Sequence, residues 1–204
     1  MKLTPTKLKL LIEEVINEGA KGIQDLPEDV YVAVFSSRYG RIFVSFANKE
    51  GSPIPPVDFD TGEDNPIWGE VSFFEKDKEN PCDDSAVIAT TEAVQGWGPF
   101  LYDIAMEVAT KRSNGLTSDR KIVSPKARKV WDYYDTQRSD VKSFQLDNEE
   151  SELTPQKQDD CGQRRSRSDS TLHGGEWSDS PLSKRYTKEP TILDSLGDKL
   201  IWKL

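Results

Sequence analysis

Histidine and cysteine are scarce in this chain of 204 residues. The sequence has one histidine, His173, and two cysteines, Cys82 and Cys161. With no Cys-x-x-Cys pair and a single histidine, it has almost no material for a zinc site or a Ser-His-Asp triad, so we expect no metal centre. Both cysteines lie in acidic, polar surroundings. This favours two free thiols in a reducing compartment, and one disulfide between them is the alternative.

Long apolar runs are also lacking. No stretch approaches the roughly 20 residues that a membrane span needs, and the opening MKLTPTKLKL is too charged for the apolar region of a signal peptide. The formal net charge of −9 provides no basic face for nucleic acid or an anionic bilayer. We therefore expect a soluble cytoplasmic protein that binds neither a membrane nor nucleic acid.

Hydrophobic residues make up 35% of the chain and charged residues 31%, so a core cannot extend over the whole length. The first 19 residues predict an amphipathic helix, with Thr4 as N-cap and Gly19 at its end, which packs on the body of the protein or on a partner. The rest divides into three predicted regions. These are a core over 28–146, a polar linker over 147–175 that is disordered or extended, and a segment over 176–204 that docks on the core.

The first half of the core has the pattern of antiparallel strands. Residues 30–35 and 41–47 are rich in β-branched and aromatic residues and flank a turn containing Gly40, which predicts a hairpin. A loop rich in Pro, Gly and Asp follows over 51–66, and further strands are predicted over 67–75 and 86–93.

Helical patterns follow the fourth strand. A helix is predicted over 99–112, and a second one begins at Ser124, with a short strand between them. A short helix over 191–196 and a strand over 199–204 are predicted near the end. The fold class is therefore α+β, a mixed, mostly antiparallel sheet flanked by helices.

Two glycines, Gly96 and Gly98, lie where the fourth strand turns into the helix. The first amides of a helix have no partner within it, and the helix dipole adds partial positive charge there, so such a turn can hold a phosphate. The alternative is a tight turn without a ligand.

The order of elements and the short motifs resemble the GNAT family of N-acetyltransferases over residues 67–134. The motif Gly96-Trp97-Gly98-Pro99-Phe100-Leu101 is similar to the family's glycine turn. Ser124, Ala127 and Trp131 have the spacing of its following helix.

The resemblance implies an acyl-CoA N-acyltransferase-like fold with acetyl-CoA as the cofactor, and a small molecule or protein that carries an amine as the acceptor. It places the phosphates beside Gln95, Gly96, Gly98 and Phe100 and the pantetheine arm along Val87, Ala89 and Thr91.

Several residues depart from the family's pattern. Ala93 replaces an Arg or Gln before the turn, Trp97 is bulky, and Pro99 lacks an N–H. Trp131 replaces the tyrosine that serves the family as general acid.

Other residues are candidates for the catalytic roles. Tyr133 or Tyr134 could act as the acid only with a re-aimed helix end, and Glu92 or Glu70 could act as general base through a water.

These departures support a second hypothesis, a non-catalytic structural or interaction protein on a degenerate acetyltransferase fold. The first helix, with the pattern MKLTxxxLKxLIxEVIxE, is similar to those of small proteins of tailed bacteriophages. This resemblance implies a virion protein whose assembly partner binds the N-terminal helix, located in the host cytoplasm or the virion.

Overall fold

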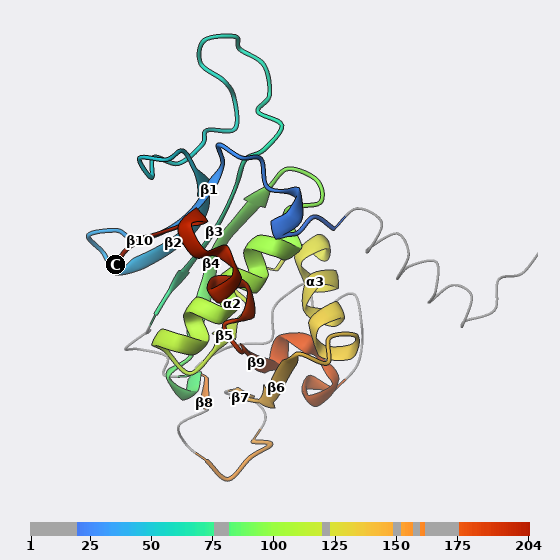
Figure 1. Ribbon diagram of the computed structural model, residues 1–204. Coiled ribbons are helices and arrows are strands. Elements are labelled where there is room, and N and C mark those ends of the chain that lie inside the picture. Colours follow the sequence, from blue (N-terminus) through green and yellow to red (C-terminus); the bar gives the residue numbers. More distant parts are fainter. Residues whose placement is uncertain (1–19, 76–81, 120–122, 149–151, 157–159, 162–175) are drawn as a thin grey trace, which may run out of the picture.

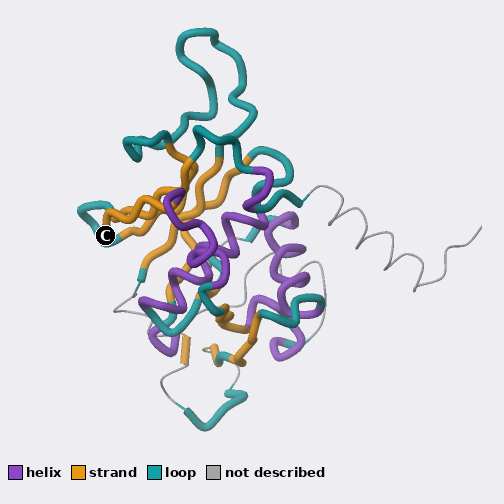
Figure 2. The backbone as a smooth tube through the Cα atoms, viewed as in Figure 1, coloured by secondary structure: helices purple, strands orange, loops and turns teal. Residues whose placement is uncertain are grey.

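The structure is a computed structural model that describes residues 20–75, 82–119, 123–148, 152–156, 160–161 and 176–204. An eight-stranded mixed sheet carries helices over one face (Figures 1 and 2), so the protein is α+β. The strands of this sheet are β1 (Tyr31–Ser36), β2 (Arg41–Ala47), β3 (Gly69–Phe74), β4 (Ala86–Ala93), β5 (Leu116–Thr117), β6 (Val141–Gln145), β9 (Lys184–Lys188) and β10 (Leu200–Lys203). Their spatial order is β10-β1-β2-β3-β4-β5-β9-β6.

Strands β1 to β4 form an antiparallel meander, as the sequence predicts. Alternate residues of these strands point to opposite faces. The face toward the helices carries the apolar side chains that form the main core, among them Val32, Val34, Val44, Phe46, Val71 and Phe73. The 51–66 segment between β2 and β3 runs as a long loop beyond the end of the sheet (Figure 1).

The longest described helix, α2 (Gly98–Arg112), lies across the apolar face of the sheet (Figure 1). Gly69 on β3 allows its close approach. A Cβ at Gly69 would lie 2.7 Å from Cδ1 of Leu101 and 2.8 Å from Cβ of Ala93. A side chain at this position would therefore require the end of Leu101 on α2 and Ala93 on β4 to shift.

A parallel crossover follows the meander, because β4 leads through α2 to β5 on its other side. Only two residue pairs join β4 and β5, Ala86 with Leu116 and Val87 with Thr117. Within the described residues, β4 beyond Val87 has no strand partner on that side. The helix α3 (Pro125–Thr136) follows, and its cap is the one predicted, since the Ser124 hydroxyl accepts a hydrogen bond from the Ala127 amide at 3.1 Å.

The C-terminal segment adds two strands far apart in the sheet. Strand β9 lies between β5 and β6, antiparallel to both, whereas β10 pairs in parallel with β1 at the opposite edge. Between them lies the helix α5 (Thr191–Leu196), which packs beside α2. The short 3-10 helices are η1 (Ile23–Asp25), η2 (Cys82–Asp84), η3 (Trp177–Asp179), η4 (Pro181–Ser183) and η5 (Gly197–Lys199).

A buried ion pair fastens α5 to α2. Glu107 on α2 is fully buried and pairs with the Lys188 ammonium, whose side chain is 2% exposed. The Glu107 carboxylate also accepts hydrogen bonds from the backbone amides of Ile192 and Leu193, at 3.0 and 2.8 Å. One acidic side chain therefore neutralises a buried cation and caps the start of α5.

Cys82 is disulfide-bonded, so the expectation of two free thiols is wrong. The sequence has one other cysteine, Cys161, which lies in β8 (Asp160–Cys161) against η2. Strand β8 pairs in parallel with β7 (Asp147–Asn148), so the predicted linker over 147–175 contains a two-stranded sheet. The remainder of that linker is described only in part, and the predicted N-terminal helix over 1–19 lies outside the described residues.

In the described part of the chain, every helix is too short or too polar to span a bilayer.

Candidate functional site

The glycine turn between β4 and α2 is built around Gly96, whose φ of 91° favours glycine. The amide of Trp97 donates to the Val94 carbonyl at 3.1 Å, and the carbonyl of Gly96 accepts from the Lys21 amide at 2.9 Å. The segment before η1 therefore runs beside the turn. Gly98 differs, since its φ is ordinary and a Cβ there would meet nothing within 4 Å. The space beside the first residue of α2 is open.

Trp97 points into the core rather than out of the turn. Its side chain is 1% exposed and makes edge-to-face contacts with Phe46 and Phe100, at centroid distances of 4.9 and 5.7 Å. The Lys21 ammonium lies 5.1 Å from the indole centroid. The bulky residue between the two glycines therefore does not block the turn, whereas Gln95 beside it is exposed.

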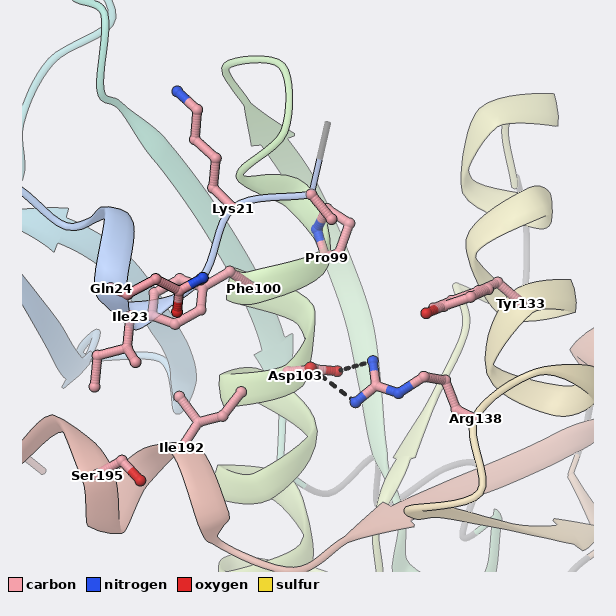
Figure 3. A pocket seen from close by; sticks show the side chains of 12 residues that line it. Lys21, Ile23, Gln24, Pro99, Phe100, Asp103, Tyr133, Arg138, Ile192 and Ser195 are labelled. Atoms are coloured by element: carbon pink, nitrogen blue, oxygen red, sulfur yellow. Dashed lines mark hydrogen bonds and ion pairs between the residues drawn. The ribbon is translucent and has the colours of Figure 1, made fainter. Parts of the chain in front are cut away.

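A cavity of about 260 Å³ opens beside the first turn of α2 (Figure 3), and we call it the α2 cavity. Pro99, Phe100 and Asp103 line it from α2, and Tyr133 projects toward it from α3. Its other walls are residues 20–24, Arg138, Ile192 and Ser195. Of the predicted site residues, Phe100 and Tyr133 thus meet at one cavity.

An ion pair forms the polar floor of the α2 cavity. Arg138 donates to both oxygens of Asp103, at 3.1 and 3.0 Å, and to Asp140 at 2.8 and 2.7 Å. Burial raises the pKa of the Asp103 carboxyl, although the bond from Arg138 opposes that shift. The hydrogen bond to Asp140 in turn raises the pKa of Arg138. Because two carboxylates already neutralise Arg138, an anion in this cavity would depend on backbone amides and Lys21.

The two candidate acid tyrosines lie in different surroundings. Tyr134 is 1% exposed, and its hydroxyl donates to Asp103 at 2.8 Å and lies 3.2 Å from the Pro99 carbonyl oxygen. Burial, with Asp103 close by, raises its pKa well above the usual value. Tyr133 is half-buried and lines the cavity. Of the two, Tyr133 is the one that a ligand in the cavity could touch.

A β-bulge interrupts the predicted pantetheine strand. Val87 pairs with Phe74, but Thr90 pairs with Ser72, two residues earlier on β3, so Ala89 is the extra residue on β4. Thr91 faces α2, where its hydroxyl donates to the Tyr102 hydroxyl at 3.1 Å. The bulge therefore places Val87 and Thr91 on opposite faces of the sheet, although their spacing alone would put them on one face.

A second cavity, of about 480 Å³, lies on the face of the sheet opposite α2, and we call it the sheet-face cavity. Its floor comes from three neighbouring strands, with Ser45 opposite Glu70 and Glu70 opposite Glu92 in the register. Trp68, Gly69, Thr90 and the segment 53–56 complete its lining. Glu92, the predicted general base, is thus separated by the sheet from Tyr133 and Tyr134.

The Glu70 carboxyl has a raised pKa. Burial is the main cause, the neighbouring Glu92 adds to it, and Arg41 opposes it. Arg41 lies beside this pair, where its guanidinium donates to the hydroxyls of Ser72 and Thr90.

The raised pKa of Glu70 predicts a pH-dependent stability. The folded state holds this proton more tightly than the unfolded chain, so the stability from Glu70 is complete below pH 4.5 and is lost as the pH rises through the raised pKa. Glu70→Gln removes that loss, so we expect a modestly higher melting temperature at neutral pH and no gain below pH 4.5. Thermal unfolding followed by circular dichroism across this range, with Glu50→Gln as an exposed control, measures the effect. An equal gain at every pH would contradict the assignment.

Sequence reasoning identified Glu70 and Glu92 but not their neighbour Ser45, nor the pair of Asp103 and Arg138. The alternation of β2 would have placed Ser45 on the polar face. Its position opposite Glu70 depends on strand register, which the sequence pattern does not specify.

Among the described residues, no group of three or more His, Cys, Asp or Glu side chains is placed to hold a metal ion. Known family models, curated proteins and solved structures offer no match to this chain.

Proposed function

We propose that this chain is a GNAT-like acyltransferase that moves an acyl group from coenzyme A to an amine. The observation that carries the proposal is the path of β4. Beyond Val87 it has no strand partner on its β5 side in the described residues, and it continues into the glycine turn and the N-terminus of α2. The succession of antiparallel strands, glycine turn, helix, short strand and helix supports the same proposal.

An unpaired strand edge suits the extended arm of this cofactor. Such an edge offers backbone N–H and C=O groups, and a ligand arm with amide groups can pair with them as an added strand would. Ala89 and Thr91 belong to this stretch, whereas Val87 pairs with Thr117 of β5 and directly precedes it. The bulge at Ala89 leaves one residue out of the ladder with β3, and a backbone N–H free of a ladder can donate to a developing oxyanion.

The first turn of α2 suits the phosphate end. The amides of Gly98 and Phe100 belong to the helix start, where no earlier carbonyl of the helix can accept from them. Space beside Gly98 is open, and the Lys21 ammonium adds a positive charge near Trp97. Gln95 and Gly96 complete the turn. Bound acyl-CoA would supply an activated thioester carbonyl.

Proton transfer is assigned to the opposite face of the sheet. Glu92 is exposed in the sheet-face cavity, from which it can accept an ammonium proton through a water. Since the Tyr134 hydroxyl is already bonded to Asp103, we assign it no proton transfer. Attack by a neutral amine on a thioester depends mainly on positioning, so a general acid is dispensable.

Isothermal titration calorimetry of the full chain with acetyl-CoA tests the proposal. We expect saturable heat below millimolar ligand, and about tenfold weaker binding or more in Gly98→Asp, because a carboxylate at the helix start repels the phosphates. The same carboxylate favours the helix, so the variant should fold. Gly98→Asn is the matched neutral control, and it should bind nearly as well as the unaltered chain.

Absence of heat at millimolar acetyl-CoA would overturn the proposal. The remaining candidate would then be the non-catalytic interaction protein on a degenerate acetyltransferase fold. One observation favours that candidate. Trp131, at the position of the family's acid, is 1% exposed and packs between Tyr102 and Tyr186, at centroid distances of 5.7 and 5.1 Å.

A further inference from the structure

Two carboxylates face each other in the sheet-face cavity without a cation between them. Glu70 and Glu92 are directly opposite in the antiparallel ladder of β3 and β4, a position that brings Cβ atoms to about 5 Å and makes like charges repel. Neither carboxylate has a hydrogen bond or an ion pair within the described part of the chain. No hydrogen bond or ion pair of these two carboxylates offsets their repulsion in the described part of the chain.

Arg41 does not cancel the pair. Its Nε donates to the Ser72 hydroxyl at 2.9 Å, and its terminal nitrogen donates to the Thr90 hydroxyl at 2.5 Å. It is close enough to lower the pKa of Glu70, but burial and Glu92 outweigh it. Two negative charges and one positive charge leave a local excess of one negative charge.

Ser45 provides an independent sign of a ligand. It is 2% exposed and lines the sheet-face cavity beside Glu70. Its hydroxyl oxygen is buried without a hydrogen-bond partner among the described residues. Buried polar groups are nearly always paired, and an unpaired one costs free energy unless something outside the chain completes it.

The walls of the cavity are apolar and held in place. Pro53, Ile54, Pro55 and Trp68 line it. Residues 53–56 are fixed to β2, because the Ile54 amide donates to the Phe46 carbonyl at 2.9 Å and Pro53 forms an isolated bridge with Ala47. A volume of about 480 Å³ is in the range of small-molecule sites. The combination suits a ligand with a cationic head and an aliphatic body.

We propose that the sheet-face cavity binds an alkyl primary ammonium, with its head between Glu70 and Glu92 and within reach of Ser45. An ammonium group has three donors and no acceptor, which matches two carboxylates and one hydroxyl. Calcium would need six to eight oxygen ligands. Binding of the ammonium requires no acyl donor. Only its role as the acyl acceptor rests on the proposed function.

Calorimetry of the full chain with n-butylammonium chloride, without acetyl-CoA, tests the site, and n-butanol is the uncharged control. We expect binding of the amine and none of the alcohol. Glu92→Gln and Glu70→Gln should each weaken binding about tenfold or more, because each removes a charge-assisted hydrogen bond. Ser45→Ala should weaken it a few-fold, and Glu50→Gln, an exposed residue outside the cavity, should leave it unchanged.

Equal binding of the alcohol, or unchanged affinity in both glutamine variants, would overturn the inference. So would displacement of the amine by Ca²⁺ or Mg²⁺ at lower concentration, since the site would then belong to a metal. Tighter binding of Nα-acetyl-lysinamide than of butylammonium would identify a lysine side chain as the source of the amine. Tighter binding of butylammonium would identify a free alkylamine as the source. Binding of the amine without binding of acetyl-CoA would uphold this site and overturn the acyltransferase.

Discussion

Replacing Glu107 by alanine is expected to destabilise the fold by about 3–5 kcal/mol, the usual cost of breaking a buried ion pair on one side. The substitution leaves the Lys188 ammonium, 2% exposed, without its main partner. It also removes the carboxylate that accepts from the amides of Ile192 and Leu193, so the start of α5 loses its cap. Urea unfolding followed by circular dichroism measures the loss.

The matched control removes both charges at once. The double variant Glu107→Leu with Lys188→Met leaves no unpaired buried charge, and a well-packed apolar pair can be as stable as the ion pair. We expect it to recover much of the stability lost in Glu107→Ala. If the single and double variants lost equal stability, packing volume rather than the unpaired ammonium would be the cause.

Replacing Gly115 by alanine should be comparably damaging, with an expected cost of about 3 kcal/mol or more, because strain and overpacking each cost about 1–3 kcal/mol. Gly115 has a φ of 101°, a conformation that side chains rarely adopt. A Cβ there would also lie 2.5 Å from the carbonyl oxygen of Tyr186, a backbone atom of β9 that cannot move without disturbing the sheet. Chemical denaturation of the purified variant measures the cost.

Substitutions at two other glycines distinguish backbone strain from overpacking. Gly40 has a φ of 75° but open space around a Cβ, so Gly40→Ala carries the strain alone, about 1 kcal/mol. Gly98 has neither feature, and Gly98→Ala should be neutral or stabilising by up to about 1 kcal/mol. Equal effects at Gly115 and Gly40 would contradict a steric role for the Tyr186 carbonyl.

The first half of the sheet was predictable because its signals are local. The alternating residues of β1 and β2 and the turn at Gly40 specify a hairpin within 17 residues, Tyr31–Ala47. Ser124 predicts the start of α3 in the same way, because an N-cap residue bonds to backbone amides within the first turn of the helix.

The remaining strands depend on distant partners. Strand β9 has the sequence KRYTK, with one apolar residue, Tyr186, and its place between β5 and β6 comes from tertiary pairing. The disulfide bond at Cys82 also depends on tertiary packing, because the acidic residues around Cys82 do not indicate which segment packs against η2. Propensity is a weak guide where packing decides.

The candidate site also has a part that depends on local sequence and a part that depends on the pairing of distant strands. The glycine turn could be predicted because Gly96 and Gly98 are separated by one residue and belong to the same local turn. The sheet-face cavity was not, because Ser45, Glu70 and Glu92 come from three strands, and their meeting depends on register. A bulge of one residue at Ala89 also reverses which residues of β4 share a face, and the sequence carries no marker for it.

The parallel pairing of β10 with β1 has a consequence for synthesis on the ribosome. Val32 lies opposite Leu200, so β1 meets this neighbour only after nearly 170 further residues have been translated. Until then the nascent chain presents an uncovered strand edge, the kind of surface that pairs with other chains. The yield of folded protein would therefore depend on how long this edge stays exposed during translation and on whether a chaperone shields it.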